Sequence, residues 1–162
     1  MEFEVSLDVK PLGTVSGWAN IIHVGRGGSQ STYGDRLPAI WFRPGTRRLH
    51  ICSSVNNDNN HCIDRNSNLP SNRFTNIRIT QDFEEASNNY RYSIFIDGNQ
   101  VHSIINRNPI TVANAKVYMA SVWTSTANVL VKNVDVKTSQ GGKEHLIKNL
   151  FFQKTIVIFI YK

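Results

Sequence analysis

Two cysteines and two histidines lie near one another in the middle of the chain: His50, Cys52, His61 and Cys62. Such side chains can bind zinc together, and the cysteines alone can form a disulfide. A Cys2His2 zinc site is disfavoured, because His61 and Cys62 are adjacent and would point to opposite faces of a strand. We therefore predict a disulfide between Cys52 and Cys62, worth about 2–3 kcal/mol through loop closure. Two free thiols in a reducing compartment are the alternative.

A second group of residues has the chemistry of a sugar-binding site. Tyr33 and Trp123 are expected in loops, where an aromatic ring can stack on the apolar face of a pyranose. Arginine forks suit sulfate and carboxylate groups, and four of them fall near the two early loops. If these loops meet at one end of the fold, an acidic glycan would contact Arg26, Arg36, Arg43, Arg47, Tyr33 and Trp123. Trp18 and Trp41 fall in expected strands and are assigned to the core.

Calcium would need hard oxygen ligands from carboxylates, amides and backbone carbonyls. The weak candidates are Asp35, after a glycine-rich segment, and Asp58 and Asp64, in and after an Asn-rich run. The spacing of an EF-hand is absent, and asparagine clusters more often form turns. No cofactor is predicted, and calcium is the alternative.

Catalytic patterns are missing. A retaining glycosidase needs two carboxylates about 5 Å apart on one face. Glu84 and Glu85 are adjacent and would point apart, whereas Glu2 and Glu4 share a face but begin the chain. There is no Gly-x-Ser-x-Gly elbow and no phosphate-binding P-loop. The prediction is that the chain is not an enzyme.

The overall composition indicates a globular domain. The chain has 162 residues, of which 40% are hydrophobic and 19% charged, with a net charge of +6. The positive charge favours acidic partners, but the basic residues are scattered, which argues against nucleic acid. The final apolar run, 156–161, is too short to span a membrane. No signal peptide is visible, so the chain is interpreted as a fragment of a secreted protein, with a cytosolic protein as the alternative.

The elements that would position these residues are strands. Apolar residues alternate over 3–9, 74–79 and 90–96, and Asp97-Gly98 joins the last run to 99–105 as a tight hairpin. Further strands are expected over 18–24, 38–43, 48–55, 116–121 and 128–136, with a polar loop over 56–61 between the cysteines. This pattern predicts an all-β fold, an antiparallel two-sheet β-sandwich of the jelly-roll type. We expect the domain over 1–138, an edge near Gly141-Gly142, and an unassigned tail over 139–162.

The order of these strands resembles the laminin-G-like and pentraxin-like branch of the concanavalin-A-like lectin/glucanase superfamily. The resemblance covers residues 2–137 and is carried by the runs 39–42, 48–51, 74–79, 92–98, 117–123 and 131–134. Phe74-Thr75 stands where that family has Trp-His, which is a departure from its pattern.

The resemblance implies a non-catalytic, extracellular binding or structural module of a secreted matrix or adhesion protein, more loosely of a mineralised skeletal matrix. Its expected partners are matrix glycans or proteins, including acidic polysaccharide. A carbohydrate-specific lectin, a glycoside hydrolase of the same superfamily and a self-associating structural module are the alternatives.

Overall fold

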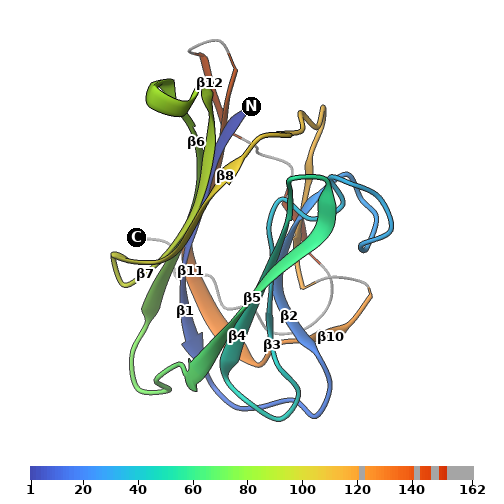
Figure 1. The fold of residues 1–162 in the computed structure, drawn as a ribbon. Helices are drawn as coiled ribbons and strands as arrows, with labels where there is room; N and C mark the ends of the chain where they lie inside the picture. Colours follow the sequence, from blue (N-terminus) through green and yellow to red (C-terminus); the bar gives the residue numbers. More distant parts are fainter. Residues whose placement is uncertain (121–122, 141–142, 147–149, 153–162) are drawn as a thin grey trace.

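The protein is a β-sandwich in the computed structural model, which describes residues 1–120, 123–140, 143–146 and 150–152 (Figure 1). Within these ranges the strands form two packed sheets, in the orders β12-β11-β1-β6-β7-β8 and β13-β9-β2-β3-β4-β5, with β10 beside β2. Most neighbouring strands run antiparallel; β10 and β13 pair in parallel. The predicted all-β, two-sheet sandwich is confirmed.

The first sheet is built from β1 (Glu2–Pro11), β6 (Thr75–Glu84), β7 (Asn89–Ile96), β8 (Asn99–Asn106), β11 (Val129–Gln140) and β12 (Lys143–Leu146). The second is built from β2 (Ala19–Gly25), β3 (Ala39–Phe42), β4 (Arg48–Val55), β5 (Asp58–Asn68), β9 (Lys116–Met119), β10 (Ser125–Thr126) and β13 (Leu150–Phe152). A single 3-10 turn, η1 (Glu85–Ser87), lies between β6 and β7 in the described chain. No described helix is long and apolar enough to cross a membrane.

Alternating side chains separate the core from the outer faces. In β1 the inward residues Val5, Leu7 and Val9 are at most 1% exposed, whereas the residues between them are only half-buried. The same alternation in β3 sends Ile40 and Phe42 into the main core between the sheets. Burial of apolar surface between the two layers is the main force that holds them together.

Tight turns fix the strand registers. Asp97 and Gly98 both have positive φ angles, as a two-residue hairpin turn between β7 and β8 requires. Asn56 and Asn57 have positive φ angles as well, and they turn the chain from β4 directly into β5. The expected polar loop over 56–61 is therefore wrong. Asparagine tolerates the left-handed conformation, so this pair makes a hairpin and the following polar residues form a strand.

Cys52 and Cys62 form the predicted disulfide. They face each other directly across β4 and β5, so the bond joins two neighbouring strands of one sheet instead of closing a loop. β5 is the last strand of the second sheet, and β8 is the last strand of the first. The disulfide therefore fastens an edge strand to the body of its sheet.

Described residues after position 138 also form β-strands. β11 continues to Gln140, β12 pairs with it in antiparallel fashion, and β13 pairs with β9. The expected domain edge at Gly141-Gly142 and the apolar run over 156–161 lie outside the described residues.

Candidate functional site

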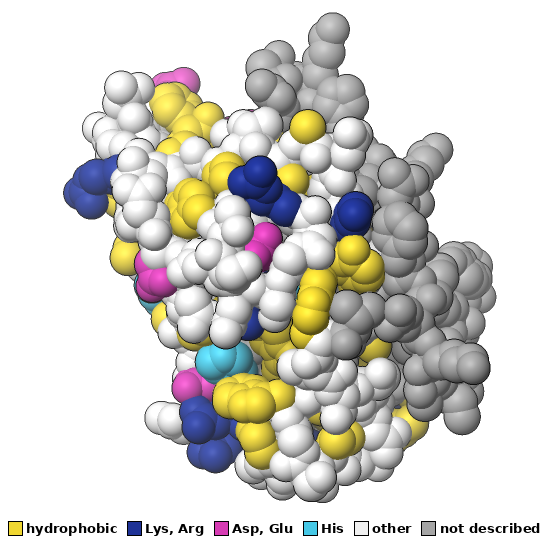
Figure 2. Space-filling view, turned by 90° about the vertical axis from the view of Figure 1, so that its right-hand side faces the viewer, with side chains coloured by type: hydrophobic (Ala, Val, Ile, Leu, Met, Phe, Trp, Pro, Cys, Tyr) yellow, Lys and Arg dark blue, Asp and Glu magenta, His cyan; other side chains and the backbone are white. Residues whose placement is uncertain are grey.

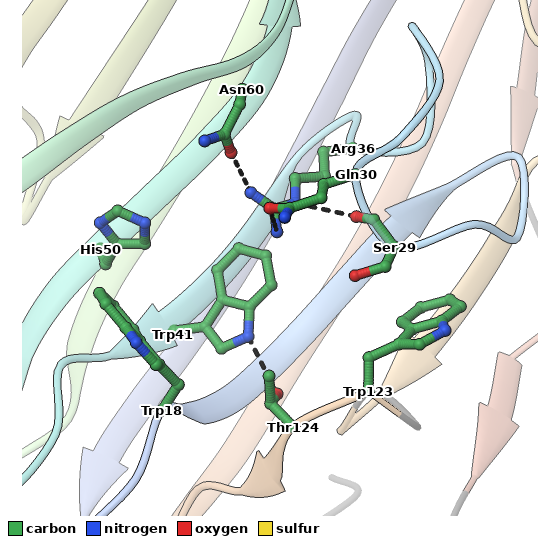
Figure 3. Close-up of a pocket in the computed structure, with 9 residues that line it drawn as sticks. All are labelled: Trp18, Ser29, Gln30, Arg36, Trp41, His50, Asn60, Trp123 and Thr124. Carbon is green, nitrogen blue, oxygen red and sulfur yellow. Dashed lines mark hydrogen bonds between the residues drawn. The ribbon is translucent and has the colours of Figure 1, made fainter.

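A pocket of about 520 Å³ lies on the outer face of the second sheet, on the side opposite the main core. The face that contains it is turned toward the viewer in Figure 2, where hydrophobic, basic and histidine side chains lie close together. Its described lining consists of Trp18, Ser29, Gln30, Arg36, Trp41, His50, Asn60, Trp123 and Thr124 (Figure 3). The lining combines aromatic rings, a cation and neutral polar groups, and includes no described Asp or Glu.

Strand register explains why Trp41 and His50 reach this face. Because Ile40 and Phe42 point into the core, Trp41 between them points outward. Trp41 pairs with His50 across β3 and β4, and it packs in a small separate cluster with Ala39, Cys52 and Cys62. Trp41 is buried as predicted, with 4% of its surface exposed, but it belongs to this small outer cluster and not to the main core between the sheets.

The prediction that Trp18 lies in the core is wrong. It immediately precedes β2, is 38% exposed, and packs against the His50 ring with a centroid separation of 4.6 Å. The Arg43 guanidinium lies 5.8 Å from the Trp18 ring on the side of the β3–β4 turn. Trp18 thus forms one wall of the pocket, with Arg43 at its margin.

Trp123 forms the opposite wall, on the far side of Trp41 from Trp18 (Figure 3). It is 37% exposed and packs against two rings of the sheet, His23 at 4.9 Å and Tyr118 at 5.7 Å between centroids. Trp41 lies between the two walls and donates a hydrogen bond from Nε1 to Thr124 Oγ1 at 3.1 Å. Two half-exposed indoles therefore flank a buried third one.

Arg36 supplies the charge of the pocket. Its guanidinium carbon lies 4.6 Å from the centre of the Trp41 ring. Nε donates to the Ser29 carbonyl at 3.0 Å, Nη2 donates to Gln30 Oε1 at 2.8 Å, and Nη1 donates to Asn60 Oδ1. These acceptors are neutral, and no carboxylate in the described chain lies within ion-pair distance of Arg36. Burial lowers the pKa of Arg36, and the nearby Asp35 opposes that shift.

The segment between β2 and β3 carries Ser29, Gln30 and Arg36. Its first residues, 25–26, lie close to residues 34–35 near its end, which fixes the shape of the loop. The Arg26 amide donates to the Gly34 carbonyl at 3.1 Å. A Cβ on Gly25 would lie 2.0 Å from the Asp35 carbonyl oxygen, so only glycine fits there. The Asp35 carboxylate accepts a hydrogen bond from the Thr32 amide at 2.9 Å inside the loop.

His23 lies beneath the pocket and is fully buried. Its Nε2 is 2.7 Å from the Asp35 carbonyl oxygen, which can only accept, so Nε2 carries the proton. Nδ1 is then an acceptor, and it has no hydrogen-bond partner among the described residues. Burial, above all, lowers the pKa of His23 to about 4, so the ring is neutral at physiological pH.

The structure brings only some of the predicted glycan contacts together. Arg36 and Trp123 line the pocket, and Arg43 lies at its margin. Arg26 donates to the Tyr33 carbonyl at 3.4 Å, and the Tyr33 hydroxyl donates to the Asn108 carbonyl at 2.6 Å, so both belong to the β2–β3 loop outside the lining. Arg47 lies in the β3–β4 turn, at the other end of β3.

The three weak calcium candidates are used within the protein. The Asp35 carboxylate stabilises its own loop, and Asp58 Oδ1 accepts from the Asn60 amide at 2.8 Å. Asp64 bridges Arg43, at 2.6 Å, and His50 Nδ1, at 2.8 Å. The one grouping of three or more potential metal ligands in the described chain is His50, Cys52 and Cys62, and it contains none of them.

Of the candidate carboxylates for glycan hydrolysis, Glu2, Glu4 and Glu84 lie on strands of the first sheet, and Glu85 lies in η1. Glu84 accepts two hydrogen bonds from Arg91, at 2.7 and 3.0 Å, and Glu4 accepts one from Arg78 at 3.3 Å. Glu2 Oε1 accepts from the Phe83 amide at 3.1 Å. None of these groups lines the pocket on the second sheet.

No protein-family model matches the chain, and no curated protein matches it. A solved structure of botulinum neurotoxin type C, described as interacting with two ganglioside molecules, aligns with 72% of this chain at 15% identity and a TM-score of 0.41. The aligned region is 30% of the neurotoxin chain, so this chain spans less than a third of its length. At these values no binding residue of the neurotoxin can be transferred to this chain.

Proposed function

We propose that this chain is a non-catalytic carbohydrate-binding module whose ligand carries an acidic group. The observation behind the proposal is Arg36, which is 8% exposed, has no carboxylate partner among the described residues, and lines one pocket with the half-exposed indoles of Trp18 and Trp123. A buried cation is costly unless it is paired or bound by an anion. A carboxylate or sulfate on a sugar would provide that anion.

Each part of the pocket has a role in such a complex. Trp18 and Trp123 can present their apolar faces to a pyranose ring. Arg36 has five N–H donors, of which three are used by Ser29, Gln30 and Asn60, which leaves two for an incoming anion. Its neutral partners hold the guanidinium in place without cancelling its charge. The ligand would thus be oriented by the rings and selected by the arginine.

Several features support a binding role in a secreted matrix or adhesion protein. The disulfide fits an oxidising compartment. The described pocket lining has no carboxylate pair for glycoside hydrolysis. A net charge of +6 favours acidic polysaccharides, including those of mineralised skeletal matrices.

The test is binding of sulfated and uronic-acid oligosaccharides to variants of the two exposed indoles. We expect Trp18→Ala and Trp123→Ala each to weaken binding at least tenfold by calorimetry, because burying a large apolar side chain contributes about 1.5–3 kcal/mol and a tenfold change corresponds to about 1.4 kcal/mol. Both side chains are partly exposed, so the fold should tolerate their loss. Phe83→Ala is the matched control, because Phe83 is 43% exposed on β6 of the other sheet.

Variants that remove one positive charge distinguish binding in the pocket from non-specific attraction of acidic glycans to a basic surface. Arg36→Gln should abolish the preference for acidic over neutral sugars, whereas Arg47→Gln, which removes the same charge outside the pocket, should leave it intact. Equal losses in the two variants would mean that net charge alone drives binding. A glycan array without discrete hits would also contradict the proposal that this pocket recognises a specific sugar.

A further inference from the structure

We propose that reduction converts the Cys52–Cys62 disulfide into a zinc site completed by His50. Zinc is bound by thiolate sulfur and imidazole nitrogen, commonly from three protein ligands plus an open position. The register of β4 and β5 places all three side chains together: His50 and Cys52 are two residues apart on one face, and Cys62 lies opposite Cys52. The proposal does not rest on the proposed carbohydrate binding, although His50 also lines that pocket.

The distances fit a shared metal ion. The three ligand atoms all lie within 4.8 Å of one another, and His50 Nε2 is 3.0 Å from Cys52 Sγ. Bonds of about 2.3 Å to sulfur and about 2.1 Å to nitrogen, at a tetrahedral angle, require nitrogen–sulfur separations of about 3.6 Å. The ligand atoms are therefore within reach of one ion. Once the disulfide is broken, rotation of the cysteine side chains must move the two sulfurs apart and lengthen the Cys52–His50 separation from 3.0 Å to about 3.6 Å.

The surroundings of His50 resemble those of a metal-bound histidine. Its Nδ1 donates to Asp64 Oδ1 at 2.8 Å, which leaves Nε2 directed at the sulfurs. Asp64 is held in turn by Arg43 through its other oxygen at 2.6 Å. A carboxylate behind the ring fixes its tautomer and orientation and raises its basicity as a ligand. Asp64 and Arg43, which orient His50 as a ligand, are therefore in place before any metal binds.

A dithiol can supply the two electrons that reduction of the disulfide requires. A thiolate of the dithiol attacks the half-buried Cys62 sulfur, the Cys52 sulfur leaves, and the second thiol of the reductant then releases Cys62. The dithiol is oxidised to its own disulfide, and the protein gains two thiols. Each thiol loses a proton when it binds Zn²⁺. The fourth coordination position would open toward the pocket, because His50 forms part of its lining.

The experiment uses the full chain, reduced with a phosphine that does not compete for metal, and Co²⁺ as a spectroscopic substitute for Zn²⁺. We expect the reduced chain to bind one Co²⁺, with a thiolate charge-transfer band that excess Zn²⁺ removes, and the oxidised chain to bind none. His50→Gln should weaken binding at least tenfold. Asp64→Asn should weaken it about 10–100-fold while leaving the band in place, because the ligands themselves are retained.

His61→Gln is the matched control, because His61 adjoins Cys62 but points to the other face, toward His102 at 3.1 Å. It should bind Co²⁺ like the unmodified chain. Circular dichroism on the same samples follows the strands during reduction. Absence of Co²⁺ uptake by the reduced chain overturns the proposal. So does equal uptake by the two histidine variants, which is the behaviour of an unfolded chain with two free thiols.

Discussion

Lowering the pH from 7 to 5 will reduce the free energy of unfolding by about 2 kcal/mol through His23 alone, and by about 3 kcal/mol near pH 4. The pKa of His23 is about 4 in the folded protein and 6.5 when the ring is unrestrained. Between these values the unfolded chain binds a proton that the folded chain does not, so stability rises with pH. The loss begins as the pH falls below 6.5 and levels off below about 4.

The physical reason is the place of His23 in the sheet. The ring is fully buried against Trp41 and Trp123, so a charge on it would lose its hydration. The nearby Arg36 guanidinium adds repulsion. Protonation of His23 would therefore disturb the pocket as well as the fold.

Urea unfolding at several pH values between 5 and 7 measures this effect. In His23→Gln, whose amide can still donate to the Asp35 carbonyl, stability should depend much less on pH in this window. The pKa of Glu84 is lowered, chiefly by its hydrogen bonds from Arg91, so the titration of this carboxylate is moved away from this pH window. Burial also lowers the pKa of His102, which leaves a small residual slope of the same sign. An unchanged slope in the variant would show that His23 is not the group responsible.

Gly25→Ala will be the most damaging single substitution near the pocket. The added Cβ would lie 2.0 Å from the backbone carbonyl oxygen of Asp35 and 3.0 Å from that of Gly34. Backbone cannot rotate away as a side chain can, so the β2–β3 segment must move. We expect a loss of about 3 kcal/mol or more in stability, at the upper end for overpacking. Because this segment carries Arg36, sugar binding should fall with it.

Gly17→Ala is the control for this substitution. A Cβ on Gly17 would meet only Ser125 Oγ at 3.8 Å, an ordinary contact, and its φ angle is not positive. The control should match or slightly exceed the unmodified chain in stability, since alanine restricts the unfolded state. Thermal unfolding of both variants gives the comparison. Similar melting temperatures for the two would contradict the close approach at Gly25.

The fold could be predicted from the sequence wherever local signals agreed. Alternation in β1 and the Asp97-Gly98 turn between β7 and β8 each indicate a strand or hairpin directly. The sequence does not indicate β5 as a strand, because all of its residues except Cys62 and Ile63 are polar, which is typical of a loop. The signal that could have revealed it was the Asn56-Asn57 pair, which suits a hairpin turn, followed by Cys62 at a position that can face Cys52.

The site was harder to predict than the fold, because it depends on which face of a strand a residue occupies. The strand position of Trp41 correctly predicts that the residue is buried, but not on which side of the sheet. Its neighbours Ile40 and Phe42 already fill the inward positions, and that alternation was the available signal for an outward Trp41. The contribution of Asn60 and Thr124 could not be foreseen, since it depends on strand pairing between distant segments.

The polar character of β5 has a consequence for solubility. A terminal strand leaves backbone amides and carbonyls unsatisfied along one border, where another chain could dock and begin an aggregate. In this protein the terminal strand β5 carries mostly amide and charged side chains, and the disulfide links it to β4. This edge of the second sheet is thereby a poor template for the addition of a strand from another chain.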